Sequence, residues 1–214
     1  MEVILRSRHT SVRGRRTPGT TPRTLEVAGL LGLALGENVP AAERRVRVPV
    51  RPGQIVLITG PSGAGKTTLL RAVRAALQRR HKQTWRIDPQ AVPSCAAVID
   101  AVGAADLSAA LECLSRAGLY DAHVLLRRVA AVSEGERFRF ELARWYASAA
   151  PVLLCDEFCA TLDHVTARIV SHQLRRFVSA QRRSAVVATC REDLADDLRP
   201  DVIVQPASAG HGPR

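Results

Sequence analysis

Short apolar runs alternate with segments of helical periodicity along most of this chain. An apolar run of about 4–8 residues between turn residues is typical of a buried strand, whereas apolar residues three or four positions apart indicate an amphipathic helix. The runs that predict strands are Val46–Val50, Gln54–Thr59, Thr84–Asp88, Val152–Asp156, Ala185–Thr189 and Val202–Val204. The segments that predict helices are Thr68–Leu77, Leu107–Ala117, Tyr120–Arg128, Glu134–Ala149, His164–Val178 and a short turn, Leu194–Leu198.

Strands and helices alternate on both sides of a purely helical stretch at about residues 91–150. This order predicts an α/β domain over residues 24–204, with a parallel-rich sheet and a small helical subdomain. Phe138, Leu142 and Trp145 recur at helical spacing within that stretch, so we interpret them as core residues rather than a platform for a nucleotide base. Residues 205–214 are expected to form a flexible tail.

One segment between a predicted strand and a predicted helix carries the strongest chemical signal. It is Gly60-Pro61-Ser62-Gly63-Ala64-Gly65-Lys66-Thr67, which fits the P-loop pattern G-x-x-x-x-G-K-[ST]. Glycines let backbone N–H groups surround phosphate oxygens, and the following helix N-terminus adds a favourable dipole. We expect all eight residues and Thr68 to bind ATP, with Lys66 on the β- and γ-phosphates and the Thr67 hydroxyl on Mg²⁺.

Two carboxylates end the predicted strand at Asp156. A carboxylate at the carboxyl end of a strand beside a P-loop can hold Mg²⁺ through water, and we assign that role to Asp156. The next residue, Glu157, can orient or deprotonate the water that attacks the γ-phosphate. The predicted catalytic residues are therefore Glu157 and Lys66.

The segment Ser133-Glu134-Gly135-Glu136 opens a predicted helix and allows two interpretations. Ser133 with Glu136 three residues later forms the pattern of a capping box, which is a sufficient structural reason for both residues. The functional interpretation is an anion site made by the helix N-terminus, the Ser133 hydroxyl and the Gly135 N–H.

Five motifs in this order resemble those of the ABC ATPases, over about residues 46–204. They are the P-loop, residues 133–136 as the signature motif, the strand ending in Asp156-Glu157, residues 160–163 as the D-loop, and the strand ending in Ala188-Thr189. Residues 156–159 and 199–202 further resemble a soluble branch often fused to a predicted acetyltransferase domain. The resemblance implies a P-loop NTPase fold and ATP hydrolysis to ADP and phosphate.

The resemblance also implies a partner. Two copies, or this chain and a paralogue, would hold two ATP molecules head to tail, with Ser133, Gly135 and Asp163 of one copy meeting the nucleotide of the other. Gln90 is the candidate for the Q-loop glutamine. Cys190 stands where the family has its switch histidine, and a neutral thiol is a poor substitute for imidazole, so slow hydrolysis is expected.

The composition is strongly basic, which raises the question of whether the chain contacts a polyanion. The chain carries 31 Lys and Arg against 20 Asp and Glu, a formal net charge of +11, and all the basic residues except Lys66 and Lys82 are arginine. Residues 1–23 hold six of these arginines without periodicity, which predicts a disordered basic arm. That arm is either a solvated tail or a contact for a polyanion such as nucleic acid.

The five cysteines lack paired CxxC spacing, so we interpret them as free thiols in a reducing compartment rather than as zinc ligands. Together with an ATP site, they predict a cytoplasmic location. Our functional hypothesis is a soluble Mg·ATP-dependent ABC-type ATPase. The alternatives are the ATP-binding subunit of a membrane transporter, with a permease partner that docks near residues 85–120, and an ATP-gated nucleic-acid binder. A third alternative is a P-loop small-molecule kinase, against which Ser133-Glu134-Gly135 and Asp163 argue.

Overall fold

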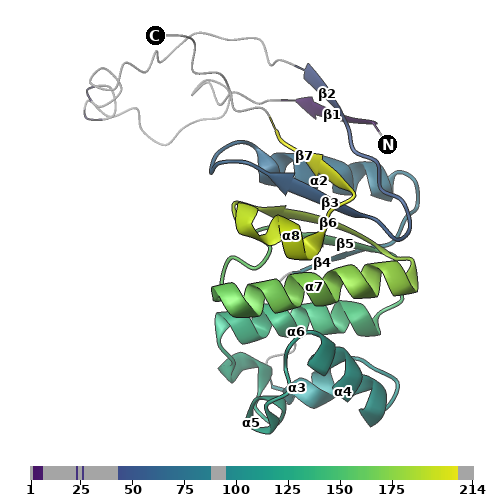
Figure 1. The fold of residues 1–214 in the computed structure, drawn as a ribbon, viewed down its shortest axis with the longest axis vertical. Coiled ribbons are helices and arrows are strands. Elements are labelled where there is room, and N and C mark those ends of the chain that lie inside the picture. The colour runs from purple at the N-terminus through teal and green to yellow at the C-terminus, as the bar shows by residue number, and fades with distance from the viewer. Residues whose placement is uncertain (1, 7–22, 24–25, 27–42, 88–94, 207–214) are drawn as a thin grey trace. The chain divides into compact units, whose positions relative to one another are not determined.

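The computed structural model describes residues 2–6, 23, 26, 43–87 and 95–206 of the chain (Figure 1). The chain divides into two compact units, Glu2–Val46 and Arg47–Arg214. The boundary predicted from the sequence lies after residue 23 instead. Within the described residues, no helix combines the length and the apolar character that crossing a bilayer would require.

The first unit contains a two-stranded sheet of β1 (Glu2–Arg6) and β2 (Glu43–Arg47). Residues 2–6 lie in the segment that we predicted to be a disordered arm, so this part of the prediction is corrected. Their apolar triplet Val3-Ile4-Leu5 favours a strand once a pairing partner is present. The strand that we predicted at Val46–Val50 also differs, because β2 ends at Arg47.

The second unit is built on a five-stranded sheet in the order β4-β5-β6-β3-β7, and every neighbouring pair is parallel. The strands are β3 (Ile55–Thr59), β4 (Thr84–Arg86), β5 (Val152–Cys155), β6 (Ser184–Thr189) and β7 (Val202–Val204). Strands β3, β5 and β6 are buried along their whole length, which explains their unbroken apolar sequences. The predicted parallel-rich α/β sheet is confirmed.

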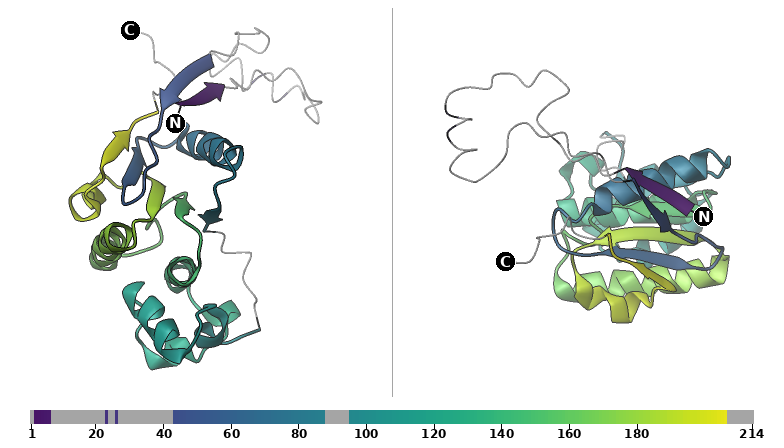
Figure 2. Two further views of the ribbon diagram at one scale, coloured as in Figure 1. Left: turned by 90° about the vertical axis from the view of Figure 1, so that its right-hand side faces the viewer. Right: turned by 90° about the horizontal axis from the view of Figure 1, so that it is seen from above.

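Helices cover both faces of this sheet. Helix α2 (Lys66–Gln78) lies on one face, while α6 (Glu134–Ala147) and α7 (His164–Gln181) lie on the other (Figure 2). Buried residues of α6 and α7 form one core cluster with alternate residues of β3, β5 and β6, such as Ile55, Leu153 and Val187. The helices η2 (Glu192–Leu194) and α8 (Ala195–Leu198) connect β6 to β7.

All the short helices that the structure describes between β4 and β5 lie in the predicted subdomain. They are α3 (Val98–Ala101), α4 (Leu107–Arg116), α5 (Ala122–Leu125) and η1 (Val129–Ala131), followed by α6. Asp106 and Asp121 cap α4 and α5 by accepting from the N–H groups of Ala109 and His123, each at 2.8 Å. Phe138, Leu142 and Trp145 are at most 7% exposed, which confirms that they belong to the core.

Candidate functional site

The P-loop has the geometry of an anion cradle. Gly60, Gly63 and Gly65 have φ angles of 142°, 79° and 89°, values that a residue with a side chain rarely adopts. Gly65 turns the backbone directly into α2. No described side chain caps this helix, and its first turn carries no acidic residue, so its N–H groups and positive dipole end remain available. These features fit a bound phosphate.

Lys66 is the first residue of α2, and its ammonium group turns back over the loop. Its Nζ donates hydrogen bonds to the carbonyl oxygens of Gly60 at 2.7 Å and Pro61 at 2.8 Å. The hydroxyl residues Thr67 and Thr68 follow it and are exposed on the first turn. The lysine charge therefore already lies at the mouth of the cradle, where phosphate oxygens would be received.

The two predicted carboxylates follow β5 at the same edge of the sheet as the P-loop. Strand β6 separates β5 from β3, and the register pairs Thr59 with Thr189 and Cys155 with Val187, so the carboxyl ends of the three strands meet. Asp156 is half-buried, whereas Glu157 is exposed. Glu157 has a left-handed φ of 52°, which is unusual for a residue with a side chain and is typical of functional loops.

The donor set at this edge fits Mg²⁺ better than a transition metal. The described residues contain no group of three or more His, Cys, Asp and Glu that could hold a metal by themselves. Mg²⁺ keeps several waters and takes one or two carboxylates plus substrate phosphates, a demand that the Thr67 hydroxyl and Asp156 meet. Burial raises the pKa of the Cys155 and Cys159 thiols, which keeps both neutral, and all five cysteines are free.

Ser133 is the N-cap of α6, and the capping box is present. The Glu136 N–H donates to Ser133 Oγ at 3.2 Å, and the Ser133 N–H donates to Glu136 Oε2 at 2.7 Å. The structural interpretation of this segment is thereby confirmed. The functional interpretation remains open, because the Ser133 hydroxyl is exposed and can still meet a further ligand.

Gly135 lies against the D-loop segment, which we define as residues 160–163. A Cβ atom at Gly135 would lie 3.1 Å from Leu162 Cδ2 and 3.3 Å from the Thr161 carbonyl oxygen, so a residue with a side chain fits here only if these neighbours move slightly. The two segments line one open cavity of about 600 Å³, to which Ser133, Asp163 and Arg139 also contribute. The structure thus brings together the predicted residues Ser133, Gly135 and Asp163.

Asp163 caps α7 from this cavity. Its carboxylate accepts from the Thr166 N–H at 2.9 Å, and hydrogen bonds from the Thr166 side chain and backbone lower the pKa of Asp163. Cys190 follows β6 and is exposed. Gln90, the predicted Q-loop residue, lies outside the described residues.

Sequence reasoning missed Arg191, the residue after Cys190. Its guanidinium donates to the Leu162 carbonyl oxygen at 2.9 Å and to the Cys159 carbonyl oxygen at 3.3 Å, so it holds the D-loop segment. These partners lie 29 and 32 positions away in the sequence, and no local pattern indicates such a contact.

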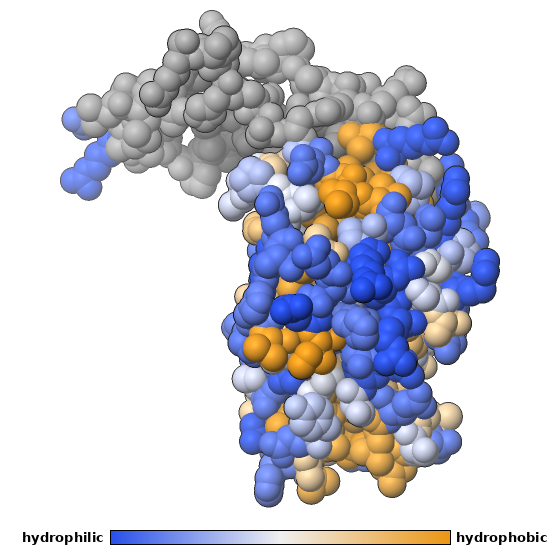
Figure 3. Space-filling view, in the orientation of Figure 1, coloured by the Kyte–Doolittle hydropathy of each residue, from blue (hydrophilic) through white to orange (hydrophobic). Residues whose placement is uncertain are grey.

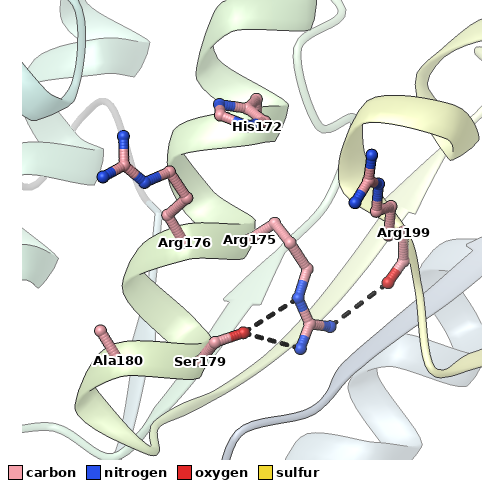
Figure 4. A pocket seen from close by; sticks show the side chains of 6 residues that line it. All are labelled: His172, Arg175, Arg176, Ser179, Ala180 and Arg199. Atoms are coloured by element: carbon pink, nitrogen blue, oxygen red, sulfur yellow. Dashed lines mark hydrogen bonds between the residues drawn. The ribbon is translucent and has the colours of Figure 1, made fainter.

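A second hollow, of about 550 Å³, lies along α7 and holds none of the predicted residues (Figure 4). It is lined by His172, Arg175, Arg176, Ser179, Ala180 and Arg199. Arg175 is engaged there by Ser179 Oγ, by the Arg199 and Gly53 carbonyl oxygens and by Asp201. This arginine therefore ties α7 to the segments that precede β3 and β7.

The space-filling view shows that the face presented in Figure 3 is largely hydrophilic, with separate apolar areas. Four of the exposed large apolar side chains belong to the helical subdomain: Leu107, Leu111, Tyr120 and Leu126. Exposed apolar groups of this kind mark candidate contact surfaces.

Comparison with known proteins places these features in a family. The family model described as AAA ATPase domain matches residues 43–189. The lipoprotein-releasing system ATP-binding protein LolD of Novosphingobium aromaticivorans is 31% identical over 198 residues, which cover 76% of this chain and 86% of that protein. The zinc import ATP-binding protein ZnuC of Pseudomonas fluorescens is 35% identical over 126 residues, which cover 52% of this chain and only 48% of ZnuC.

Among solved structures, a similar fold occurs in the dimeric post-hydrolysis state of the ATP-binding cassette MJ0796 bound to ADP and Pi. The TM-score is 0.63 at 19% sequence identity, and the match covers 81% of this chain and 90% of that one. At this identity the likeness concerns the fold. It agrees with the parallel sheet, the P-loop and the helical subdomain described above.

Proposed function

The chain belongs to the ABC-type ATPases, and on that premise we propose that it binds Mg·ATP and hydrolyses it to ADP and phosphate through a head-to-tail dimer. The observation that carries the proposal is that the predicted nucleotide-binding residues fall into two separate groups on the chain. The P-loop, Asp156 and Glu157 lie at the ends of β3 and β5, whereas Ser133, Gly135 and Asp163 line a separate cavity. A second copy brings the two groups together around one nucleotide.

The proposed steps assign each residue one task. The P-loop N–H groups and Lys66 bind and orient the phosphates of ATP. Thr67 and Asp156 would hold Mg²⁺, which when bound supplies positive charge to the β- and γ-phosphate oxygens. Glu157 accepts a proton from the attacking water. Cys190 lacks the imidazole that the family places there, so we propose that hydrolysis is slow.

The test is sizing by light scattering, with and without Mg·ATP, of the wild type and of Glu157→Gln. We expect an ATP-dependent dimer that Glu157→Gln traps, because the amide keeps nucleotide binding but cannot accept the proton. Glu112→Gln, which changes an exposed carboxylate of α4, is the matched control and should behave as the wild type. Lys66→Ala should abolish the effect of ATP. A Glu157→Gln protein that binds ATP and stays monomeric would contradict the proposal.

A second candidate function is the ATP-binding subunit of an ABC transporter. The similarity to LolD and ZnuC favours it, and so do the exposed apolar side chains of the helical subdomain, which lie in or near the predicted docking region at residues 85–120. The chain would then act at the cytoplasmic side of a permease. Co-purification with a membrane protein, lost on Leu107→Glu and Leu126→Glu, supports this candidate.

The nucleic-acid hypothesis rests on the net charge of +11 and the arginines of residues 1–23. Binding of DNA or RNA that weakens steeply with salt would support it. Binding that is unaffected by salt or by deletion of residues 1–23 would contradict it.

A further inference from the structure

The D-loop segment is held by the chain that follows β6. Arg191 Nη1 donates to the carbonyl oxygens of Cys159 and Leu162, which lie on either side of Ala160 and Thr161. Thr189 Oγ1 donates to the Phe158 carbonyl oxygen at 3.1 Å and accepts from the Arg191 N–H at 3.1 Å. The backbone just before and within the D-loop segment is therefore fixed by two residues that flank Cys190.

Asp193 holds the other side of the same guanidinium. Arg191 Nη2 donates to Asp193 Oδ2 at 2.9 Å, and Arg191 Nε approaches Oδ1 at 3.3 Å. Asp193 Oδ2 also lies 3.0 Å from Nδ1 of His164, the first residue of α7. Arg191 thus holds the D-loop segment through the carbonyl oxygens of Cys159 and Leu162, and Asp193 joins this arginine to His164, which directly follows the segment.

The position of the D-loop segment decides the shape of the cavity that contains Ser133. A Cβ atom built on Gly135 would lie 3.1 Å from Leu162 Cδ2 and 3.3 Å from the Thr161 carbonyl oxygen, so α6 and the segment approach closely at this glycine. Asp163, the last residue of the segment, lines the same cavity. A displacement of the segment would therefore change the shape of the cavity that it lines together with the start of α6.

An arginine suits this task better than a lysine. The planar guanidinium donates in several fixed directions, so one side chain reaches two carbonyl oxygens and a carboxylate at the same time. Its side chain is 23% exposed, so these bonds are partly shielded from water. A lysine ammonium keeps the charge beside Asp193 but loses the fixed fork.

We propose that Arg191 is a positioning residue, which fixes the D-loop segment so that the cavity of Ser133, Gly135 and Asp163 is preformed for the nucleotide held by a second copy. This inference rests on the proposed head-to-tail dimer. Arg191 acts through the backbone that it binds and needs no contact with ATP. It occupies the position next to Cys190, so it supplies order at the point where the family histidine is missing.

The test compares Arg191→Ala, Arg191→Lys and Asp193→Asn in the Glu157→Gln background. The matched control is Arg168→Ala, because Arg168 of α7 also pairs with an aspartate, Asp197 at 2.7 Å, and makes no hydrogen bond to the D-loop segment within the described part of the chain. Four quantities are measured for each variant: affinity of the monomer for a fluorescent ATP analogue, the ATP concentration at half-dimerisation, and, with Glu157 restored, kcat and KM.

We expect Arg191→Ala to keep the nucleotide affinity of the monomer and to need about tenfold more ATP to dimerise, as expected for the loss of charge-assisted hydrogen bonds. Its kcat should fall with little change in KM. Arg191→Lys should lie between Arg191→Ala and the parent, while Arg168→Ala should match the parent.

Two results would overturn the inference alone. One is an Arg191→Ala protein that dimerises at the same ATP concentration as Arg168→Ala. The other is an Arg191→Ala protein that loses monomer nucleotide affinity to the same extent as dimerisation, since that pattern indicates a general loss of structure. If Glu157→Gln itself stays monomeric, the proposed dimer is wrong and the inference falls with it.

Discussion

Gly135 shows how one missing methyl group sets the distance between two parts of the site. The space that its Cβ would need is taken by Leu162 Cδ2 at 3.1 Å and by the Thr161 carbonyl oxygen at 3.3 Å. The backbone oxygen belongs to the D-loop segment that Arg191 holds, so it has little freedom to move away.

Gly135→Ala should therefore lower the free energy of unfolding of the monomer by about 0–2.5 kcal/mol and impair the dimer. Alanine favours a helix over glycine by about 0.5–1 kcal/mol, while the crowding costs about 1–3 kcal/mol. Thermal unfolding gives the stability, and light scattering in the Glu157→Gln background gives the dimer. An ATP-dependent dimer of undiminished affinity would contradict a trans role for Gly135.

At the residue scale, local chemistry was predictable and distant contacts were not. The P-loop residues, the Ser133 cap and the acidic end of β5 each lie within a few positions of the pattern that indicates them. Arg191 has no such pattern, because its partners lie about 30 positions away and become neighbours only in the sheet. The residues next to Arg191 in the sequence, Cys190 and Glu192, do not distinguish it from an ordinary surface arginine.

Helix α6 joins the two interpretations of Ser133 in one element. Its capping box stabilises the helix end, and its N-terminal turn faces the cavity shared with Asp163. A single deletion cannot separate the structural role from the functional one, because Ser133→Ala removes both the cap and the hydroxyl.

Ser133→Ala and Ser133→Asp together separate them. Ser133→Ala should lower the free energy of unfolding by about 1 kcal/mol, the usual value of a lost N-cap. Ser133→Asp keeps a capping oxygen, so its stability should match the wild type, yet its carboxylate would repel the phosphates of a second copy. Urea unfolding and sizing with ATP measure the two effects. If Ser133→Asp still dimerises on ATP addition, the segment is only a cap.

The boundaries of helices and strands were likewise predictable where local sequence sets them and not where distant contacts do. Predicted strands buried on both faces match the structure closely, since β3, β5 and β6 are unbroken apolar runs. The predicted helix Tyr120–Arg128 is shorter, because Asp121 caps α5 and the helix ends at Leu125. The shift of β2 to Glu43–Arg47 reflects pairing with residues 2–6, which alternation alone does not reveal.

At the scale of the second unit, one carboxylate ties the sheet edge to the strand that leads into the P-loop. Asp201 Oδ2 accepts from the Ile55 N–H at 2.8 Å and from Arg175 Nη1 at 2.6 Å. Burial raises the pKa of Asp201, but the hydrogen bonds from Ile55 and Arg175 outweigh it, so the pKa is lowered overall.

Asp201→Asn should lower the free energy of unfolding at pH 7 by about 1 kcal/mol, because the site is partly exposed. A lowered pKa in the folded state means that this stabilisation is present above the ordinary aspartate pKa of about 4 and is lost as the pH falls below it. The difference between wild type and variant should therefore stay constant from pH 7 to about pH 5 and shrink as the pH falls through about 4 and below. Asp196→Asn, at an exposed position of α8, is the control, and a pH-independent difference would contradict the assignment.

The order of the strands is the part of the fold that the sequence did not reveal. Parallel strands that lie side by side must be connected by a crossover. The pairing of β3 with β6 and with β7 therefore brings together residues that are more than 125 positions apart in the sequence. The location of Asp156 beside the P-loop was nevertheless predictable, because the carboxyl ends of parallel strands share one edge.

Lys66 donates two hydrogen bonds to carbonyl oxygens of its own loop, so a bound phosphate would compete with these oxygens for the ammonium group. On binding a phosphate, the Lys66 ammonium group would give up hydrogen bonds to two neutral carbonyl oxygens and form hydrogen bonds to charged phosphate oxygens. The net free energy of binding is then the difference between these two sets of hydrogen bonds. Ligands with a fully ionised terminal phosphate gain most, since that charge is what the carbonyl oxygens lack. In the proposed function, the loop would therefore select for the number of negative charges on a nucleotide, before any contact with its base or sugar.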